Sequence, residues 1–152
     1  MDLKKYDGLC VRIIDLNGDT FDGICRYHTF EHGRCEESLQ ILGFFFYKSN
    51  IKEIESLEGR KGPYGKFLNP YGKIEEMAVQ EGFGSILDVL FGDEKEHVYR
   101  MLHCLDKYFD PYFGYDFPYR YETIGALCEL YDVTDDGYIK EEAGRLLDMW
   151  GK

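Results

Sequence analysis

The chain has 152 residues, of which 18 are Lys or Arg and 29 are Asp or Glu, so its formal net charge is -11. A hydrophobic content of 44%, with 16% aromatic residues, is typical of a chain that folds around a core, and it excludes a disordered or fibrous protein. The length suits one compact domain or two small ones and excludes a large multidomain enzyme. The longest apolar stretch, residues 41–47, is far shorter than the roughly 20 residues that cross a bilayer, so no membrane partner is expected.

The N-terminal segment MDLKKYDGLC carries charge and is followed by no long apolar run, which predicts a cytoplasmic chain. The five cysteines form an odd set without C-x-x-C spacing, so we expect no disulfide framework. Cys104 and Cys128 fall on the apolar faces of expected helices, where a free thiol acts as a small hydrophobic group. We therefore expect both thiols in the core.

Residues 1–58 show the two-residue alternation of β-strands. The expected strands span residues 11–15, 20–27, 38–47 and 51–54. Between the first two, Asn17-Gly18 predicts a tight hairpin turn in which both central residues have positive φ. About five short strands are too few for a large sandwich, so we expect a small, strongly bent barrel.

Residues 74–152 follow the spacing of amphipathic helices. The expected helices span residues 75–91, 93–109, 118–131 and 138–150. Gly82 and Gly84 should divide the first into two short helices or kink it, and Asp93 with Glu96 has the spacing of a capping box. Short connections favour antiparallel neighbours. The predicted fold class is therefore α+β, a five-stranded barrel followed by an antiparallel helical bundle.

The acidity belongs to the helical part of the chain. Residues 1–66 hold 10 basic and 11 acidic side chains, whereas residues 67–152 hold 8 basic and 18 acidic ones. Between the two parts, residues 59–73 are rich in Gly, Pro and Tyr and are expected to form a linker.

The segment YDGLCVRIIDLNGDTFDGICRY, residues 6–27, contains Gly8, Val11, the Leu16-Asn17-Gly18 turn, Phe21 and Gly23. This pattern resembles the first sequence motif of the Sm and Sm-like family of small barrels, over residues 3–58 of the chain. The resemblance implies an Sm-like or SH3-like barrel with Gly23 at a sharp bend of the second strand. That family binds single-stranded RNA through Asp-x-x-x-Asn and Arg-Gly loops, and the corresponding residues 28–37 and 47–51 carry neither. The resemblance therefore implies the barrel and not the RNA function.

Charge also disfavours nucleic-acid binding, because affinity for nucleic acid comes largely from Lys and Arg that neutralise phosphates. A local basic group stands in the linker, beside Tyr64 and Tyr71: Arg60, Lys61, Lys66 and Lys73. It could stack on and pair with a single strand, although such charges are normally just solvated. RNA binding by an Sm-like barrel stays an alternative.

His28, His32 and Cys35 form the one cluster with the ligand chemistry of zinc. A structural zinc site needs four ligands, and this hairpin tip supplies three in a loop, so we expect a solvent-facing loop and no metal or cofactor. Cys35 beside His28 or His32 would be a thiolate pair, but no orienting group or oxyanion donor accompanies it. A zinc protein or an enzyme at this loop is the second alternative.

Residues 108–121 contain eight aromatic side chains in fourteen positions. We expect Phe109, Phe113 and Phe117 in the core of the bundle, because aromatic residues at a helix corner wedge helices together. Three of the five tyrosines of this segment, Tyr112, Tyr115 and Tyr119, are the candidates for contact with a partner.

Residues 132–139 resemble the beginning of a calcium-binding EF-hand loop, but Ala143 stands where a bidentate carboxylate would close the site. Thr134 or Asp135 is therefore expected to cap the last helix. The acidic residues around this helix start, Asp135, Asp136, Glu141 and Glu142, are further candidates for contact with a partner.

Taken together, these patterns predict a non-enzymatic, cytoplasmic interaction protein with no catalytic residues. Its acidic, aromatic-rich helical part is expected to bind a basic protein, for example by covering the cleft of a nuclease. Assembly into a homo-oligomer remains open.

Overall fold

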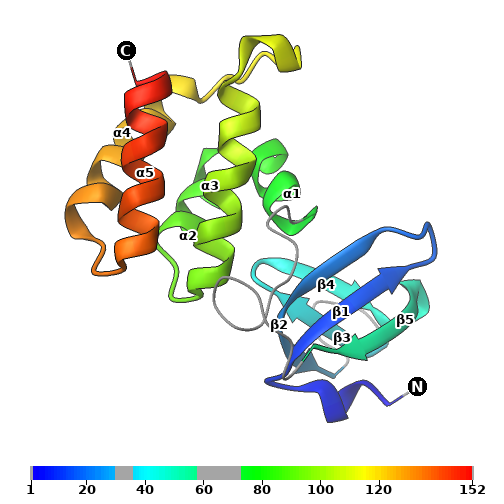
Figure 1. Cartoon of the computed structure of the whole chain (residues 1–152). Helices are drawn as coiled ribbons and strands as arrows, with labels where there is room; N and C mark the ends of the chain where they lie inside the picture. Colours follow the sequence, from blue (N-terminus) through cyan, green and yellow to red (C-terminus); the bar gives the residue numbers. More distant parts are fainter. Residues whose placement is uncertain (1, 30–35, 58–72, 152) are drawn as a thin grey trace. The chain divides into compact units, whose positions relative to one another are not determined.

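The computed structural model describes residues 2–29, 36–57 and 73–151 (Figure 1). The chain divides into two compact units, Met1–Asn69 and Pro70–Lys152, which we call the sheet unit and the helical unit. The fold is α+β, an antiparallel sheet followed by helices. The predicted linker, residues 59–73, lies outside the described residues except for Lys73, which begins the first α-helix. No helix among the described residues combines the length and apolarity needed to cross a membrane.

The sheet unit contains one antiparallel sheet in the order β4-β3-β2-β1-β5. Its strands are β1 (Cys10–Asp15), β2 (Thr20–His28), β3 (Ser38–Ile41), β4 (Phe44–Tyr47) and β5 (Ile51–Ser56). Strand β2 joins two ladders, because residues 20–24 pair with β1 and residues 25–28 pair with β3. The sheet is open: each of the edge strands β4 and β5 pairs with a single described strand, and the closure expected of a barrel is not seen.

The two faces of the sheet follow the alternation in the sequence. Val11, Ile13 and Phe21 are buried on one face, whereas Arg12 and its strand neighbours carry polar groups on the other. Short 3-10 turns, Leu3–Tyr6 and Lys48–Asn50, precede the sheet and connect β4 to β5. The period of two therefore places one apolar layer in the core of this unit.

The turn between β1 and β2 differs from the prediction. Only Gly18 has a positive φ, of 86°, whereas Asn17 does not. The Asp15 carboxylate accepts hydrogen bonds from the amides of Asn17 and Asp19, at 2.9 and 3.0 Å. This side chain stabilises a longer loop closed by an Asp15–Asp19 backbone hydrogen bond, in place of a two-residue turn.

The strand expected over residues 38–47 is in fact two strands, β3 and β4. They are joined at Leu42-Gly43, and Leu42 has a φ of 53°. Gln40 donates a hydrogen bond to the Leu42 carbonyl, at 2.6 Å. The apolar run in the sequence hid this turn, because leucine rarely adopts a left-handed conformation.

The helical unit contains α1 (Lys73–Glu81), α2 (Phe83–Leu90), α3 (Lys95–Phe109), α4 (Arg120–Val133) and α5 (Gly137–Trp150). The 3-10 turn η3 (Pro111–Phe113) follows α3. The predicted break in the first helix is confirmed at Gly82, whose φ of 152° suits glycine. The expected capping box before α3 is wrong: the N-cap is Glu94, and its side chain makes no capping hydrogen bond.

The start of α5 is capped by Asp136 and not by Thr134 or Asp135. Asp136 Oδ1 accepts a hydrogen bond from the Ile139 amide, at 3.0 Å. Thr134 Oγ1 in turn accepts a hydrogen bond from the Asp136 amide, at 3.2 Å. The cap therefore lies one residue after Asp135 and two after Thr134, and α5 begins at Gly137, one residue before the predicted start.

The bundle is not antiparallel throughout. Helices α4 and α5 are antiparallel neighbours, because Tyr131 near the end of α4 lies beside Lys140 near the start of α5. Helices α3 and α5, however, run in the same direction, since Tyr99 meets Tyr138 and Asp106 meets Trp150. The reason is topological: α4 carries the chain back to the end at which α3 began.

The core of the helical unit is apolar and follows the helical period. Met101, Leu102 and Leu105 of α3 are buried together with Leu127 of α4 and Leu146 of α5. Cys104 is buried as expected. Cys128 is exposed, which corrects its assignment to the core, because the buried face of α4 is set by Thr123, Ala126, Leu127 and Leu130.

Candidate functional site: an exposed aromatic surface

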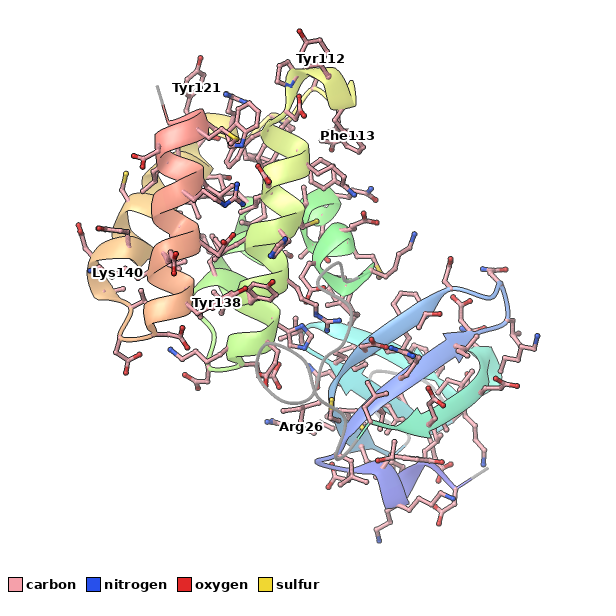
Figure 2. All side chains as sticks on the ribbon, in the orientation of Figure 1. Arg26, Tyr112, Phe113, Tyr121, Tyr138 and Lys140 are labelled. Carbon is pink, nitrogen blue, oxygen red and sulfur yellow. The ribbon has the colours of Figure 1, made fainter. Side chains whose placement is uncertain are left out.

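Of the large aromatic side chains exposed at one end of the helical unit, we group three as the aromatic surface: Tyr112, Phe113 and Tyr121. Tyr112 is 97% exposed, Tyr121 is 81% exposed and Phe113 is 45% exposed. Figure 2 shows Tyr112 and Phe113 projecting from η3, and Tyr121 at the same end, close to the end of α5. The exposure of Phe113 corrects its assignment to the core.

The backbone of η3 fixes the direction of Tyr112. Asp110 caps this turn, since its carboxylate accepts a hydrogen bond from the Tyr112 amide, at 2.9 Å. Pro111 occupies the first position of the turn, and Gly114 ends it with a left-handed φ of 84°. A proline and a capped start leave this short segment little freedom, so the Tyr112 ring is held in solvent by a defined backbone.

Beneath the surface, Tyr108 anchors the segment to the bundle. Its buried ring contacts Phe113 edge-on at 5.2 Å and Tyr115 at 5.0 Å between centroids. The Lys107 ammonium lies 5.1 Å from the centroids of both the Tyr108 and the Phe113 rings. Phe113 is therefore held by one face while its other face meets solvent.

Arg120 ties together the helix ends that carry the aromatic surface. Its guanidinium donates to the carbonyls of Phe109 and Trp150, at 2.8 and 3.5 Å. These carbonyls end α3 and α5, where the helix leaves acceptors unpaired and the helix dipole favours a cation. Because Tyr121 follows Arg120 directly, this contact also fixes the first turn of α4 under the Tyr121 ring.

The other two predicted tyrosines differ from each other. Tyr115 is 39% exposed and, like Phe113, packs on Tyr108. Tyr119 is half-buried and stacks on Phe83, with ring centroids 6.1 Å apart. Sequence reasoning thus identified the exposed Tyr112 and Tyr115 and missed Tyr121, whose position next to Arg120 at the start of a helix was the available signal.

Of the predicted acidic residues, Asp135 and Asp136 lie at the opposite end of α5, and Glu141 and Glu142 lie in its first half. Asp135 is exposed and forms an ion pair with Lys95 at 3.2 Å, and this lysine lowers the pKa of the Asp135 carboxyl. Glu141 is exposed, and Glu142 pairs with Arg145 at 3.1 Å. A helix of 14 residues is about 20 Å long, so the structure does not bring these carboxylates together with the aromatic surface.

A polar seam joins α3 to α5 between these two ends. Asp106 accepts hydrogen bonds from Trp150 Nε1, at 2.8 Å, and from Arg145, at 3.4 Å. His103 lies nearby; burial lowers its pKa, and the charge of Glu142 opposes this. The hydrogen bonds of Asp106 link α3 to α5, which suits a structural tie between parallel helices.

Sequence reasoning also missed a buried charged cluster between α1 and α3. Glu75, His97 and Arg100 are almost completely enclosed. One Glu75 carboxylate oxygen lies 2.5 Å from His97 Nδ1 and 3.7 Å from Arg100 Nε. Glu94 approaches the other ring nitrogen of His97, at 3.6 Å. Such an enclosed ionic group holds α1 against α3 and presents no surface to a partner.

Of the three predicted zinc ligands, His32 and Cys35 lie outside the described residues. His28 is described: its Nε2 lies 2.8 Å from Gln40 Oε1, and its ring lies beside Phe45. Within residues 2–29, 36–57 and 73–151, no three His, Cys, Asp or Glu side chains are grouped so that they could hold a metal ion.

Two buried thiols are poor nucleophiles. Burial raises the pKa of Cys25 to about 11 and that of Cys104 to about 12. The thiolate is the reactive form, so both groups are protonated near neutral pH. Among the described residues, the aromatic surface is the strongest candidate for a contact site. Against protein families, curated proteins and solved structures, the chain shows no match.

Proposed function

We propose that this chain is a non-enzymatic cytoplasmic protein that binds a basic partner protein through the aromatic surface. The observation that carries the proposal is the exposure of Tyr112 and Tyr121, 97% and 81%, on a rigid end of the helical unit. Exposed single aromatics are common, but several on one fixed end of a unit are typical of contact surfaces.

The chemistry of the aromatic surface suits a partner rich in Lys or Arg. Tyrosine offers a large contact area at a low cost in conformational entropy, and its ring attracts cations. The contacts of Asp110 and Arg120 hold the backbone under Tyr112 and Tyr121, so little further ordering is needed on binding. Each cation over an exposed ring contributes about 0.5–1 kcal/mol.

The charge of the helical unit supports the same partner. Residues 67–152 carry 8 basic and 18 acidic side chains. Asp135 and Glu141 lie far from the aromatic surface, so we assign them a role in attraction at a distance and not in contact. Such attraction speeds association and weakens as salt screens it.

The experiment is affinity capture from cell extract with the unaltered chain, with Tyr112→Ala/Tyr121→Ala, and with Tyr131→Ala as an exposed-tyrosine control. We expect the unaltered chain and the control to retain a basic protein at low salt, and the double variant to lose most of it. Recovery of no basic partner, or equal recovery by the double variant, would contradict the proposal. Replacement of Asp135, Asp136, Glu141 and Glu142 should slow association without abolishing capture.

The two alternative functions and the family resemblance stay predictions. Zinc at His28, His32 and Cys35 rests on two residues outside the described part of the chain. RNA binding has no support from the nearly neutral charge of residues 1–66. The likeness of residues 3–58 to Sm-like barrels concerns only the fold of the sheet unit and adds nothing to the proposed docking.

A further inference from the structure

Helix α4 carries apolar or small residues on its outer face as well as on its inner face. Four of them share the spacing i, i+3, i+4 and i+7 and form one stripe, which we call the α4 face: Tyr121, Ile124, Gly125 and Cys128. Ile124 is half-buried, and the other three are exposed. The stripe that starts at Thr123 has the same spacing and is buried in the core. A helix with apolar residues on two opposite faces is typical of one that is covered on both sides.

Gly125 makes the middle of the α4 face low. It stands inside a helix, where glycine is about 1 kcal/mol less favourable than alanine. Its φ is not positive, and beyond the helix's own backbone a Cβ there would meet no described atom within 4 Å. Gly144 of α5 differs, because a Cβ there would lie 3.1 Å from the Tyr131 ring. A neighbouring helix thus uses the space at Gly144, whereas the small size of Gly125 suits the close approach of a neighbour from outside the described residues.

The α4 face has a shape that fits a second helix. Tyr121 and Cys128 lie about two turns apart, and Gly125 leaves a notch between them. When helices pack, a side chain of one enters such a gap between side chains of the other. From Tyr121 to Asp132 the helix rises about 16 Å, which matches about three turns of a partner helix.

Carboxylates line one edge and one end of the α4 face. Glu122 and Glu129 are seven residues apart and lie along the same edge, and Asp132 lies at the end. All three are exposed. Arg120 is the one basic residue of α4, and its guanidinium is held by the carbonyls that end α3 and α5. The α4 face therefore favours a helix that carries Lys or Arg beside its apolar stripe.

We propose that the α4 face binds an amphipathic helix of the basic partner, with apolar side chains at i, i+3, i+4 and i+7 and with Lys or Arg along one flank. This inference rests on the proposed function for its partner, since Tyr121 belongs both to the aromatic surface and to the α4 face. One apolar side chain of the partner enters the notch at Gly125, and its cations lie along the acidic edge. A second copy of this chain does not fit, because its α4 face offers the same carboxylates and no cation to pair with them.

The test uses the full chain and a labelled peptide of about four helical turns, built from Ala, Leu and Lys. Its leucines follow the spacing i, i+3, i+4 and i+7, and a lysine follows the first and the last of them. A peptide of the same composition with its leucines spread around the helix is the comparison. Fluorescence anisotropy at low salt should show at least tenfold tighter binding of the striped peptide, because only it presents one apolar face. Equal binding would overturn the proposal and indicate attraction by charge alone.

Gly125→Arg should weaken binding of the striped peptide at least tenfold, because a long cationic side chain fills the notch and repels the lysines. The variant keeps α4, since arginine is a better helix former than glycine and its Cβ meets no described atom. The matched control is Gly84→Arg in α2, at an exposed glycine where a Cβ also meets no described atom within 4 Å. It adds the same charge and should change binding less than twofold. Equal effects of the two variants would overturn the proposal.

Glu122→Gln/Glu129→Gln should weaken binding of the striped peptide about fivefold, since it removes two exposed ion pairs. The control Glu81→Gln/Glu141→Gln makes the same change in net charge on exposed residues of other helices and should change binding less than twofold. If the two pairs of substitutions act equally, the acidic edge of α4 has no specific role and the proposal is wrong.

Cys128 reports contact on the α4 face in the unaltered chain. Saturating striped peptide should slow the reaction of this thiol with iodoacetamide at least tenfold, because the bound helix covers it. The protection should disappear in Gly125→Arg. Unchanged labelling in the presence of bound peptide would place the peptide elsewhere and overturn the proposal. Protection of Cys128 at high protein concentration without peptide would identify a second copy as the occupant and also overturn it.

Tyr112→Ala separates this inference from the docking proposed above, because Tyr112 belongs to the aromatic surface and not to the α4 face. It should reduce capture of the basic partner and leave binding of the striped peptide unchanged, whereas Gly125→Arg should reduce both. A partner that is lost with Tyr112→Ala and retained with Gly125→Arg would support the proposed function and overturn this inference. Protection of Cys128 by the peptide with no basic protein captured would contradict the proposed function and support the helix-binding site.

Discussion

The two units of this protein hold their charges in opposite ways. The sheet unit is nearly neutral, and its strongest ion pair, Arg12 with Asp22, lies on the outer face of the sheet. The helical unit has a large excess of acid, yet it encloses Glu75, His97 and Arg100 between two helices. The contrast shows that the net charge of a unit does not tell where its charged side chains are buried. Strands are held together by backbone hydrogen bonds, whereas neighbouring helices contact each other only through side chains, so a buried ionic cluster can link two helices.

A second contrast concerns the ends of elements. In the sheet unit, strand ends are closed by turns in which side chains bond to nearby backbone, as Asp15 does. In the helical unit, Arg120 reaches the last carbonyls of two other helices. Helix ends leave more backbone groups unpaired than strand ends do. Long cationic side chains such as that of Arg120 can therefore donate hydrogen bonds to the unpaired carbonyls at the ends of helices.

The largest expected effect is in the reactivity of the buried thiols, which compares the interior of the sheet unit at Cys25 with that of the helical unit at Cys104. Raised pKa values of about 11 for Cys25 and about 12 for Cys104 leave little thiolate at pH 8. We expect exposed Cys128 to react with iodoacetamide before Cys25 and Cys104, which should react at least a hundredfold more slowly, since each pKa unit costs tenfold in thiolate. Mass spectrometry of the timed reaction gives the order. Early labelling of Cys104 would show that the helical interior opens readily.

Glu75→Ala should destabilise the helical unit by about 3 kcal/mol, because it leaves the buried His97 and Arg100 without their carboxylate. Asp22→Ala removes the partner of a half-exposed arginine and should cost the sheet unit only about 1–2 kcal/mol. Urea unfolding followed by Trp150 fluorescence reports the helical unit, and hydrogen exchange of β1 and β2 reports the sheet. If the two losses are equal, the contrast between the enclosed cluster of the helical unit and the partly exposed ion pair of the sheet unit fails.

The adjacent residues Asp135 and Asp136 at the start of α5 allow the contribution of a helix cap to stability to be compared with that of an exposed ion pair. Asp136→Ala removes the cap on the Ile139 amide and should cost about 1 kcal/mol. Asp135→Ala removes only an exposed pair with Lys95 and should cost less than about 0.5 kcal/mol. Both values come from the Trp150 unfolding curve. The reverse order would assign the cap to Asp135, as the sequence had suggested.

The smallest expected effect is at the β3–β4 turn. Leu42→Gly should stabilise the sheet unit by about 0.5 kcal/mol. The left-handed conformation is strained for leucine, and relief of this strain should exceed the entropy that glycine adds to the unfolded chain. Thermal unfolding by far-ultraviolet circular dichroism measures the change. Gly43→Ala is the control and should be nearly neutral, since a Cβ there meets no atom within 4 Å. A loss on Leu42→Gly would mean that the packing of the leucine side chain outweighs the backbone strain.

The candidate site was predicted only in part. Tyr112 stands in an aromatic run and beside Pro111 and Gly114, which mark a turn, so its exposure followed from local signals. Phe113 belongs to the same run and was assigned to the core, because a sequence does not show which ring at a corner turns inward. The exposure of Tyr121 depends on neighbours from other elements, and no local pattern indicates it.

By itself, the sequence determined the class of each element: the two-residue period of β1 and β2, the helical spacing of α3 and α5, and the break at Gly82. These features come from hydrogen bonds and side-chain directions within a few residues, so they are visible in a short window. Only the tertiary structure decided that Glu75 is enclosed and that α3 and α5 run in the same direction. Such outcomes depend on which faces of distant segments meet, and burial is a property of that meeting and not of the residue.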